Sequence, residues 1–439
     1  MITKIFLRTR LIYFLVISCF ILFGRSFSGI SVFSYRIGEW ITALCLLLSI
    51  IFLFLGYKRF DQYLIGKQVN FIHKLIIFSF FLELALNSPI NRSAYIFKAS
   101  SYIWIIVSLY IGNFVFSKIN YEYNFFNSFF VFLPIIFIFQ TTFYPELFKT
   151  FFDNFSDKFE FLKAGDVLLI FVLTLLILQN TLNNSLKYKT IFLFTFSIFL
   201  PYFLYASKGA FLAAVIFLFL QLNSIKSIFT KFTLKNISIL IGSIVLFFSS
   251  TFYIYGNFIF EKIPGESIEL VDNLDIVDSL SAIVEERNTT EAFFSFYVEE
   301  KRLYSEDVTA NWRLQIWQDI IQDLDETDNV LFGYGYNKII PAMDDKERRG
   351  SDGKNENVHN YFFNIFARGG LFQLFLIMTF HIFIVFYYFK KFKNLKILKF
   401  VLPIFLVSFF DTSMESVRFP FLYYSFLGYF FNEDSIYLQ

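Results

Sequence analysis

His359 is the side chain in this sequence best suited to accept a proton from a substrate hydroxyl. The chain has three histidines: His73 begins an apolar run, His381 lies inside one, and His359 stands where a polar segment meets an apolar one. Imidazole titrates near neutral pH and therefore serves well as a general base. A lone histidine is more often structural, so the residue type alone leaves both interpretations open.

Arg313 lies 46 residues before His359, in the segment 310–324, whose apolar residues recur at helical spacing. The residues predicted to share one face of this helix are Arg313, Trp317, Ile320, Ile321 and Leu324. Thr309 or Asn311 is the expected N-cap. A guanidinium on an apolar face either extends to a membrane surface or points into a site, where it is able to bind a diphosphate through two hydrogen bonds.

Three glycines lie between and after these residues. Gly333 and Gly335 flank a single tyrosine, which permits a tight turn or a close approach of the backbone. A plain turn is the simpler interpretation of this pair. Gly370 follows His359 inside the next apolar run.

The elements that must position these residues are membrane helices. Of the 439 residues, 56% are hydrophobic and 17% are charged, with a mean hydropathy of +0.57. Soluble domains average about 45–50% apolar and about 25% charged residues. Several runs are long enough to span a bilayer, and they do not alternate as barrel strands would. We therefore predict an all-α polytopic membrane protein of about twelve helices with one large extracytoplasmic loop.

The predicted spans follow the apolar runs. They are 10–25, 39–56, 70–87, 95–116, 125–143, 166–183, 189–206, 209–223, 236–255, 368–389, 398–412 and 419–431. The segment 144–165 has the mixture of Phe and charge that is typical of an interfacial helix. The expected organisation is an N-terminal bundle at 1–255, a polar loop with short helices at 256–358 and C-terminal helices at 359–439.

Lys and Arg are enriched in alternate short loops, most strongly in the loop 390–399. Because such loops stay in the cytoplasm, we expect both termini to be cytoplasmic and the large loop to be extracytoplasmic. Acidic residues outnumber basic ones by roughly two to one in that loop, but long loops are translocated largely regardless of charge.

The order of the motifs resembles the O-antigen ligase and O-antigen polymerase superfamily of bacterial surface-polysaccharide glycosyltransferases. His359-Asn360, nine residues and Gly370 are similar to its signature, although Gln373 occupies a place usually taken by Gly, Thr or Tyr. Arg368 stands where many members have an acidic residue. The arginine helix, the glycine turn and the element Ser207-Lys-Gly-Ala210, with Lys208 in place of Arg, are also similar to family elements.

This resemblance implies a metal-independent enzyme without cofactor that uses an undecaprenyl-diphosphate-linked oligosaccharide donor. His359 would position or deprotonate the acceptor hydroxyl, and Arg313 would stabilise the leaving diphosphate. Lys208, Asn360 and Arg418 are the expected contacts to diphosphate or glycan; Trp317, Gly333, Gly335 and Gly370 are structural. For Arg418, Asp411 and Glu415, interfacial anchoring is at least as good an interpretation.

Polymerase and ligase are the two activities to separate. The broken signature and Lys208 favour a polymerase that joins lipid-linked repeat units; the alternative is a ligase that moves polymer onto lipid A core or another glycan or lipid acceptor of lipopolysaccharide synthesis. The expected location is the bacterial cytoplasmic (inner) membrane, with a flippase and a chain-length regulator as further partners.

A transporter or flippase of lipid-linked sugars is the alternative from another class, with Glu83 and Lys98 as its few intramembrane candidates. The small net charge of +2 argues against a nucleic-acid partner, and Cys19 and Cys45, both in apolar runs, argue against a disulfide or zinc site.

Overall fold

Apolar runs become the longest helices of this chain. The computed structural model describes residues 2–54, 65–87, 94–116, 129, 146–158, 163–231, 233–259, 295–349, 356–411 and 413–436. The described part is mostly helical, which agrees with the predicted all-α class. The predicted span 125–143 lies outside the described residues, apart from Phe129.

The long helices are as follows: α1 Ile2–Gly29, α2 Ile37–Phe54, α3 Lys67–Asn87, α9 Ala164–Thr181, α10 Leu186–Ala206, α11 Lys208–Thr230, α12 Leu234–Ile259, α15 Tyr361–Phe392, α16 Lys396–Phe410 and α17 Arg418–Ile436. Eight of the described helices are long and apolar enough to cross a membrane, namely α1, α2, α3, α9, α10, α11, α12 and α15. The chain is thus a multi-pass membrane protein, and the number of about twelve spans stays a prediction.

The predicted single helix at 95–116 is broken. It consists of α4 (Ala94–Ala99), α5 (Ser101–Trp104), the 3₁₀ turn η3 (Ile105–Val107) and α6 (Ser108–Phe116). The break comes at Ser100, whose hydroxyl donates to the carbonyl of Ile96 at 2.7 Å and accepts from the indole of Trp104 at 2.9 Å. Serine side chains compete with the helical backbone in this way, and an apolar run does not reveal it.

Two further differences concern helix ends. The helix predicted at 368–389 begins seven residues earlier, at Tyr361, and ends at Phe392. Its apolar residues continue on both sides of Arg368, which therefore lies inside the helix. Gly370 has φ 64° and bends this helix.

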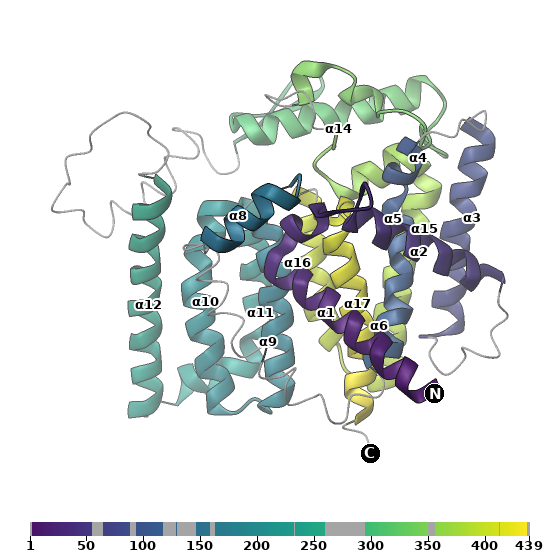
Figure 1. The fold of residues 1–439 in the computed structure, drawn as a ribbon. Helices are drawn as coiled ribbons and strands as arrows, with labels where there is room; N and C mark the ends of the chain where they lie inside the picture. The colour runs from purple at the N-terminus through teal and green to yellow at the C-terminus, as the bar shows by residue number, and fades with distance from the viewer. Residues whose placement is uncertain are drawn as a thin grey trace.

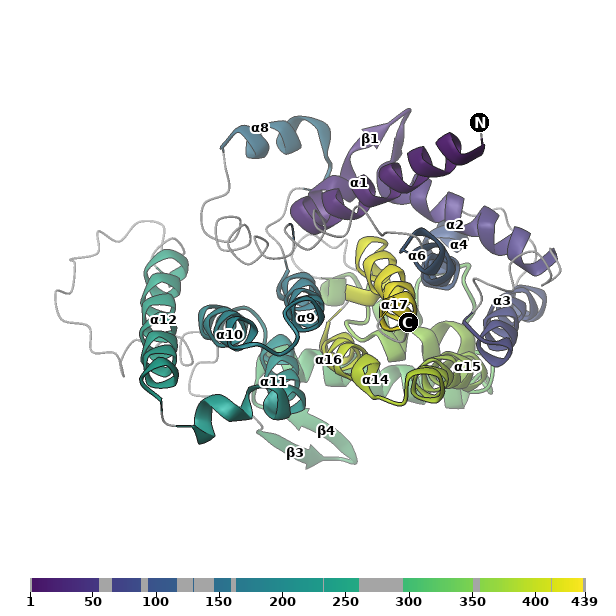
Figure 2. The ribbon, with the colours of Figure 1, turned by 90° about the horizontal axis from the view of Figure 1, so that it is seen from below.

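The helices form two groups, which Figure 2 shows end-on. α10 packs against α11, α12 and α9, and α12 stands at the outer edge of this group. In the second group α17 packs against α6 and α15 packs against α3. α16 joins the groups because it contacts α11 and α9 on one side and α15 on the other.

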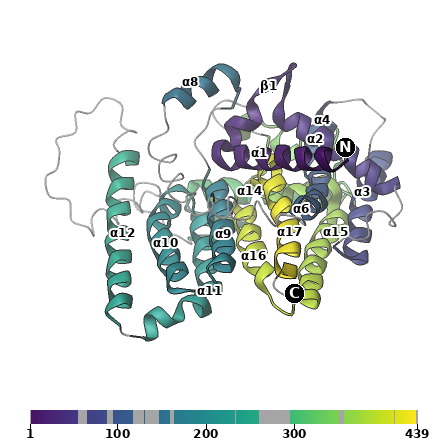
Figure 3. The ribbon, with the colours of Figure 1, turned by 60° about the horizontal axis from the view of Figure 1, so that its bottom comes forward.

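The polar elements gather at one end of the bundle. Helix α14 (Val308–Glu326) lies across that end, and the C-terminus lies at the opposite end (Figure 1). The amphipathic helix α8 (Glu146–Phe155) also lies across rather than along the bundle, beside the hairpin of β1 (Ser31–Val32) and β2 (Tyr35–Arg36) (Figure 3). A second hairpin, β3 (Phe296–Glu299) with β4 (Arg302–Ser305), packs against α14. Short 3₁₀ turns occur at Pro341–Met343 (η5), Lys346–Arg349 (η6) and Ser413–Glu415 (η7).

Candidate active site

Helix α14 carries Arg313 and begins at an aspartate. The carboxylate of Asp307 accepts a hydrogen bond from the amide of Ala310 at 2.8 Å, so Asp307 is the N-cap. The prediction that Thr309 or Asn311 caps this helix is therefore wrong. Asp307 also pairs with Lys208 at the start of α11. This ion pair connects the loop helix to the membrane bundle.

The apolar face of α14 packs onto the loop and the start of α15. Ile316, Trp317, Ile320 and Leu324 are buried in one cluster with Tyr334, Met343 and Val358. Ile321, which was predicted to share this face, is 49% exposed. The buried face therefore follows Ile316, Ile320 and Leu324, which recur every four residues beside Trp317, and Ile321 points to the outside.

Trp317 attaches α14 directly to the segment that carries His359. Its indole N–H donates to the carbonyl of Val358 at 2.8 Å, and its ring stacks on Phe363 with a centroid distance of 5.2 Å. Phe409 of α16 meets the same ring edge-on at 5.8 Å. The structural role expected for Trp317 is consistent with these contacts.

The glycine turn and Gly370 are two halves of one backbone contact. The amides of Tyr334 and Gly335 donate to the carbonyls of Ala367 (2.7 Å) and Arg368 (3.0 Å). Further along, the amide of Leu371 donates to the carbonyl of Val330 at 2.9 Å. We call this pairing of 330–335 with 367–372 the glycine contact.

Only glycine fits at two positions of the glycine contact. Gly333 and Gly370 have φ of 75° and 64°, a region that other residues rarely adopt. A Cβ on Gly333 would lie 2.7 Å from the carbonyl oxygen of Ala367, and one on Gly370 would overlap the carbonyl oxygen of Leu331. Gly333 and Gly335 do form a turn, as the sequence predicts. The sequence does not predict that this turn packs against residues 367–372.

Gln373 and Arg368, the two residues that depart from the family signature, are buried and stabilise the glycine contact. Gln373 is fully buried and accepts hydrogen bonds from the hydroxyls of Tyr102 (2.5 Å) and Tyr336 (2.7 Å). Arg368 is also buried and donates to the carbonyl of Gly335 and to the hydroxyl of Tyr95. Both side chains therefore hold the loop against the bundle.

His359 and Asn360 form the entry to α15. The Asn360 side chain accepts from the amides of Phe362 (2.9 Å) and Phe363 (3.2 Å), so Asn360 is the N-cap of α15. His359 has φ 54°, a left-handed conformation in which histidine is enriched among non-glycine residues. The bend turns the imidazole toward α14, where its ring meets Trp312 edge-on at a centroid distance of 4.9 Å.

Arg313, His359 and Asp411 lie close enough to influence one another electrostatically, and we call them the Arg313–His359 cluster. Burial and the positive charge of Arg313 lower the pKa of His359 to about 4; Asp411 opposes this and Lys163 adds to it. Burial also lowers the pKa of Arg313, which Asp411 and Asp307 oppose. The Nε of Arg313 is buried without a hydrogen-bond partner among the described residues. The cluster thus combines a neutral imidazole with a guanidinium that has an unused hydrogen-bond donor.

The other two predicted contacts to the substrate are engaged in ion pairs. Lys208 pairs with Asp307, and the pair is partly exposed. Arg418 is buried and binds Asp166 through its Nε, 3.1 Å from each carboxylate oxygen, and through a terminal nitrogen. Asp166 lies in the first turn of α9 and Arg418 begins α17, so this pair ties two helices together at the α14 end of the bundle.

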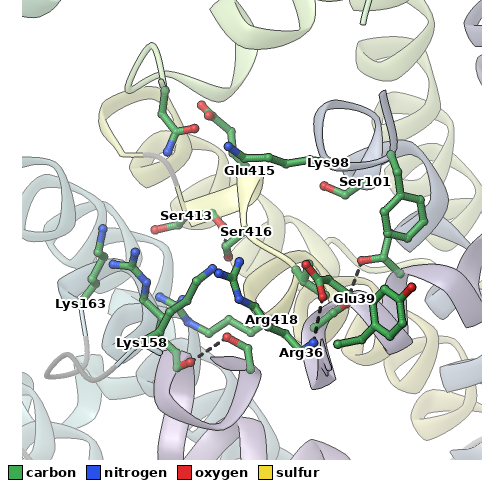
Figure 4. Close-up of a pocket in the computed structure, with 18 of the residues that line it drawn as sticks. Arg36, Glu39, Lys98, Ser101, Lys158, Lys163, Ser413, Glu415, Ser416 and Arg418 are labelled. Atoms are coloured by element: carbon green, nitrogen blue, oxygen red, sulfur yellow. Dashed lines mark hydrogen bonds between the residues drawn. The ribbon is translucent and has the colours of Figure 1, made fainter. Parts of the chain in front are cut away.

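A cavity of about 700 Å³ opens beside the cluster (Figure 4). It lies between the ends of α1 and α2, the segment 95–101 and the turn η7. Its basic lining residues are Arg25, Arg36, Lys98, Lys158, Lys163 and Arg418, against the acidic residues Glu39 and Glu415. Lys163 belongs both to this lining and to the electrostatic surroundings of His359.

Sequence reasoning missed Asp166 and Asp307, and it missed Lys158 and Lys163 of this cavity. The pairing of Asp166 with Arg418 could have been predicted, because each residue begins an apolar run and both lie at the same predicted depth in the membrane. Lys158 and Lys163 lie in the segment assigned to an interfacial helix, where α8 in fact ends at Phe155. No group of three or more His, Cys, Asp or Glu side chains with the proximity of metal ligands occurs in the described ranges.

Comparison with protein-family models matches residues 167–378 to the O-antigen ligase family. A search among curated proteins finds no match. The matched region runs from α9 to the first half of α15 and includes Lys208, Arg313, the glycine contact and His359. The family match, the helical architecture and the order of the motifs agree, and residues 167–378 of this chain are similar to the O-antigen ligase family.

Proposed function

We propose that this protein is a polysaccharide polymerase that transfers a glycan from an undecaprenyl-diphosphate-linked donor to a second lipid-linked repeat unit at the extracytoplasmic face of the membrane. The observation that carries the proposal is the Arg313–His359 cluster, in which a loop helix and the entry to α15 bring a guanidinium beside a neutral imidazole. Arg313 belongs to helix α14, which lies across one end of the bundle (Figure 1).

The reaction follows from these two groups. A neutral imidazole accepts the proton of the acceptor hydroxyl as that oxygen attacks the anomeric carbon of the donor sugar. The bond between that carbon and the diphosphate oxygen breaks, and the electron pair leaves with the diphosphate. Arg313 stabilises the developing negative charge through its unused hydrogen-bond donors. The transfer changes no oxidation state, so it requires no oxidant or reductant. The proton stays on His359 until it returns to solvent.

Asp411 has a supporting role in this scheme. As the proton arrives on His359, the negative charge of Asp411 stabilises the imidazolium, which agrees with its upward influence on the pKa of His359. Lys208 is a second cation near the N-terminus of α14, where it also neutralises Asp307. Asn360 orients the entry to α15 through its side-chain cap and does not need to contact substrate.

The contacts of Gln373 and Arg368, the two residues that depart from the family signature, favour a polymerase over a ligase. Gln373 and Arg368 are built into the contact between loop and bundle through Tyr102, Tyr336 and Tyr95. Polymerases are expected to diverge in sequence according to the repeat unit that they join, and a scaffold that has changed around the site fits this expectation. The ligase remains the second candidate, because the residues 167–378 match the O-antigen ligase family.

Deletion of the gene and complementation with His359→Ala or Arg313→Ala tests the chemistry. Each variant should lose at least about 100-fold in chain growth, the usual contribution of a general base or of a preorganised charge. Arg302→Gln is the matched control, because Arg302 is another loop arginine and pairs with Asp319 away from the cluster. Full-length surface polysaccharide from both cluster variants, at normal protein levels, would show that these residues are not catalytic.

Purified protein separates polymerase from ligase. With a lipid-linked repeat unit as the sole glycan, a polymerase produces a ladder of longer lipid-linked products. A ligase leaves that substrate unchanged until lipid A core or another acceptor is added. Absence of a ladder with repeat units alone, together with transfer on addition of acceptor, would replace the proposal with the ligase.

A further inference from the structure

The cavity beside the Arg313–His359 cluster has more positive charge than its own ion pairs use. Arg36 pairs with Asp157, Arg418 with Asp166, and Lys98 with Glu356. Lys158 and Lys163 also line the cavity, and neither has an ion-pair partner among the residues that the structure describes. Two ammonium groups are therefore left to face the cavity.

The field at Lys158 supports this picture. Burial lowers the pKa of Lys158, and Arg36, Arg25 and Arg418 lower it further, against the single opposing effect of Asp157. In Figure 4 the labelled side chains of Lys158 and Lys163 lie on the left, Glu39 lies on the right, and Arg418 and Arg36 lie between them. An anion that enters would relieve the repulsion among these cations.

The two acidic residues of the cavity, Glu39 and Glu415, offset this charge only in part. Glu39 accepts a hydrogen bond from the amide of Arg36 at 2.8 Å. Burial and the neighbouring Asp411 raise the pKa of Glu415 well above its ordinary value, which favours the protonated carboxyl. Its Oε1 is buried without a hydrogen-bond partner among the described residues. Glu415 therefore presents an unused polar atom to the cavity.

Other lining groups fit a sugar. The hydroxyls of Ser28 and Thr42 donate to backbone carbonyls at 2.7 Å and 3.0 Å, which leaves their lone pairs available to the O–H groups of a ligand. Tyr35 and Tyr95 add aromatic rings to the lining. The volume of about 700 Å³ falls within the roughly 300–1,000 Å³ of small-molecule sites and far exceeds what a diphosphate alone requires.

The position of the cavity indicates which part of the substrate enters it. Arg313 and His359 are not among its lining residues, so the reacting atoms lie outside it. Asn357, two residues before His359, and Lys163 are at its border with the cluster. A sugar next to the reacting unit would therefore extend from the cluster into the cavity.

We propose that this cavity binds an acidic, carboxylate-bearing sugar of the glycan substrate, with Lys158 and Lys163 as the cations that recognise it. The inference rests on the proposed function for the identity of the substrate as a glycan. It adds a substrate class, an acidic repeat unit, and a binding site separate from the Arg313–His359 cluster.

A binding experiment with soluble probes tests the site without the transfer reaction. Full-length protein in nanodiscs of neutral lipid is titrated with tetragalacturonate, with the neutral tetramer maltotetraose, and with pyrophosphate. Tetragalacturonate should bind at least about 10-fold more tightly than maltotetraose. The variant carrying Lys158→Gln and Lys163→Gln should lose about 10-fold of that affinity, or about 1.4 kcal/mol, with little change for maltotetraose.

Lys149→Gln is the matched control, because Lys149 is an exposed lysine of the adjacent helix α8. It should bind tetragalacturonate as the unaltered protein does. Equal affinity for the acidic and neutral tetramers, or no effect of the double variant, would overturn the proposal. Lysine-dependent binding of pyrophosphate without binding of tetragalacturonate would overturn it as well, because the cavity would then be a diphosphate site.

Kinetics with the lipid-linked repeat unit gives a second and independent measurement. Removal of the two lysines should raise KM about 10-fold and leave kcat within about 2-fold, because the cations bind substrate away from the reacting atoms. A fall in kcat with unchanged KM contradicts the site. His359→Ala should abolish transfer yet bind tetragalacturonate normally, so a failure of the proposed function and a failure of this inference give different results.

Discussion

His359 combines a strained backbone with a neutral side chain. Its left-handed conformation places the ring edge-on against Trp312, and burial together with Arg313 lowers its pKa to about 4. A lowered pKa means that the imidazole loses its proton above about pH 4 and is available as a base throughout the neutral range. The guanidinium that would stabilise a leaving diphosphate thus also keeps the imidazole neutral.

Reaction of His359 with diethyl pyrocarbonate measures this directly, because only neutral imidazole reacts. In the protein without substrate, the rate should stay high from pH 7.5 down to about pH 5 and fall only near pH 4. Arg313→Gln removes a charge that lowers the pKa and should move the midpoint upward, toward the ordinary 6.5. Asp411→Asn removes a charge that raises the pKa and should move the midpoint downward.

The remaining histidines provide little background in this measurement. His73 and His381 are 0% and 2% exposed, so neither should react in the folded protein. His359→Gln should abolish the fast phase. A midpoint near pH 6.5 in the unaltered protein, or the same midpoint in both charge variants, would mean that Arg313 and Asp411 do not control the imidazole.

At the scale of elements, the loop is held on the bundle by backbone as well as by side chains. The glycine contact pairs 330–335 with 367–372, and Gly333 and Gly370 leave no room for a Cβ. Because Arg313 reaches His359 only when α14 is docked, the geometry of the cluster depends on two glycines that contact no substrate.

Gly333→Ala and Gly370→Ala should each destabilise this docking. A left-handed alanine costs about 1–3 kcal/mol, and the overlap with backbone carbonyls adds to that cost. The expected result is faster proteolysis within 295–349 and a loss of transfer activity with the bundle still folded. Gly242→Ala in α12 is the control, because its Cβ would meet only the ring of Phe194 at 3.1 Å, which is free to shift. Equal protease resistance of all three variants would refute the dependence.

The elements differ in how far the sequence predicts them. Long apolar runs predict the helices well, because a bilayer demands paired backbone along some 20 residues. The break at Ser100 and the start of α15 at Tyr361 depend on side-chain hydrogen bonds, which hydropathy does not register. For the same reason Asp307, and not Thr309 or Asn311, caps α14.

The site also has a part that the sequence predicts and a part that it does not. Arg313 and His359 were recognisable from residue type and order, and the structure brings them together. The pairs Lys208–Asp307 and Arg418–Asp166 join residues 99 and 252 positions apart, and no local pattern in a single sequence reports such partners. The cavity is harder still to foresee, because its lining comes from α1, α2, the segment 95–101 and η7.

At the scale of the whole molecule, charge and geometry indicate one orientation. The lysine-rich turn between α15 and α16 lies at the end opposite to α14 (Figure 1). Short lysine-rich loops stay in the cytoplasm, so α14, the Arg313–His359 cluster and the cavity are predicted to face the extracytoplasmic side. A lipid-linked glycan already moved across the membrane would meet all three there.

Cysteine labelling in spheroplasts tests this orientation. Cys19 and Cys45 are first replaced by serine and alanine, and single cysteines are then introduced by Asp325→Cys in α14 and Asn394→Cys in the lysine-rich turn, both at exposed positions. A membrane-impermeant maleimide should label Asp325→Cys in intact spheroplasts and Asn394→Cys only after permeabilisation. The reverse pattern would place α14 in the cytoplasm, where no extracytoplasmic lipid-linked glycan reaches it, and would remove the basis for the proposed reaction. Labelling of both positions in intact spheroplasts would mean that the helices between them do not separate two compartments.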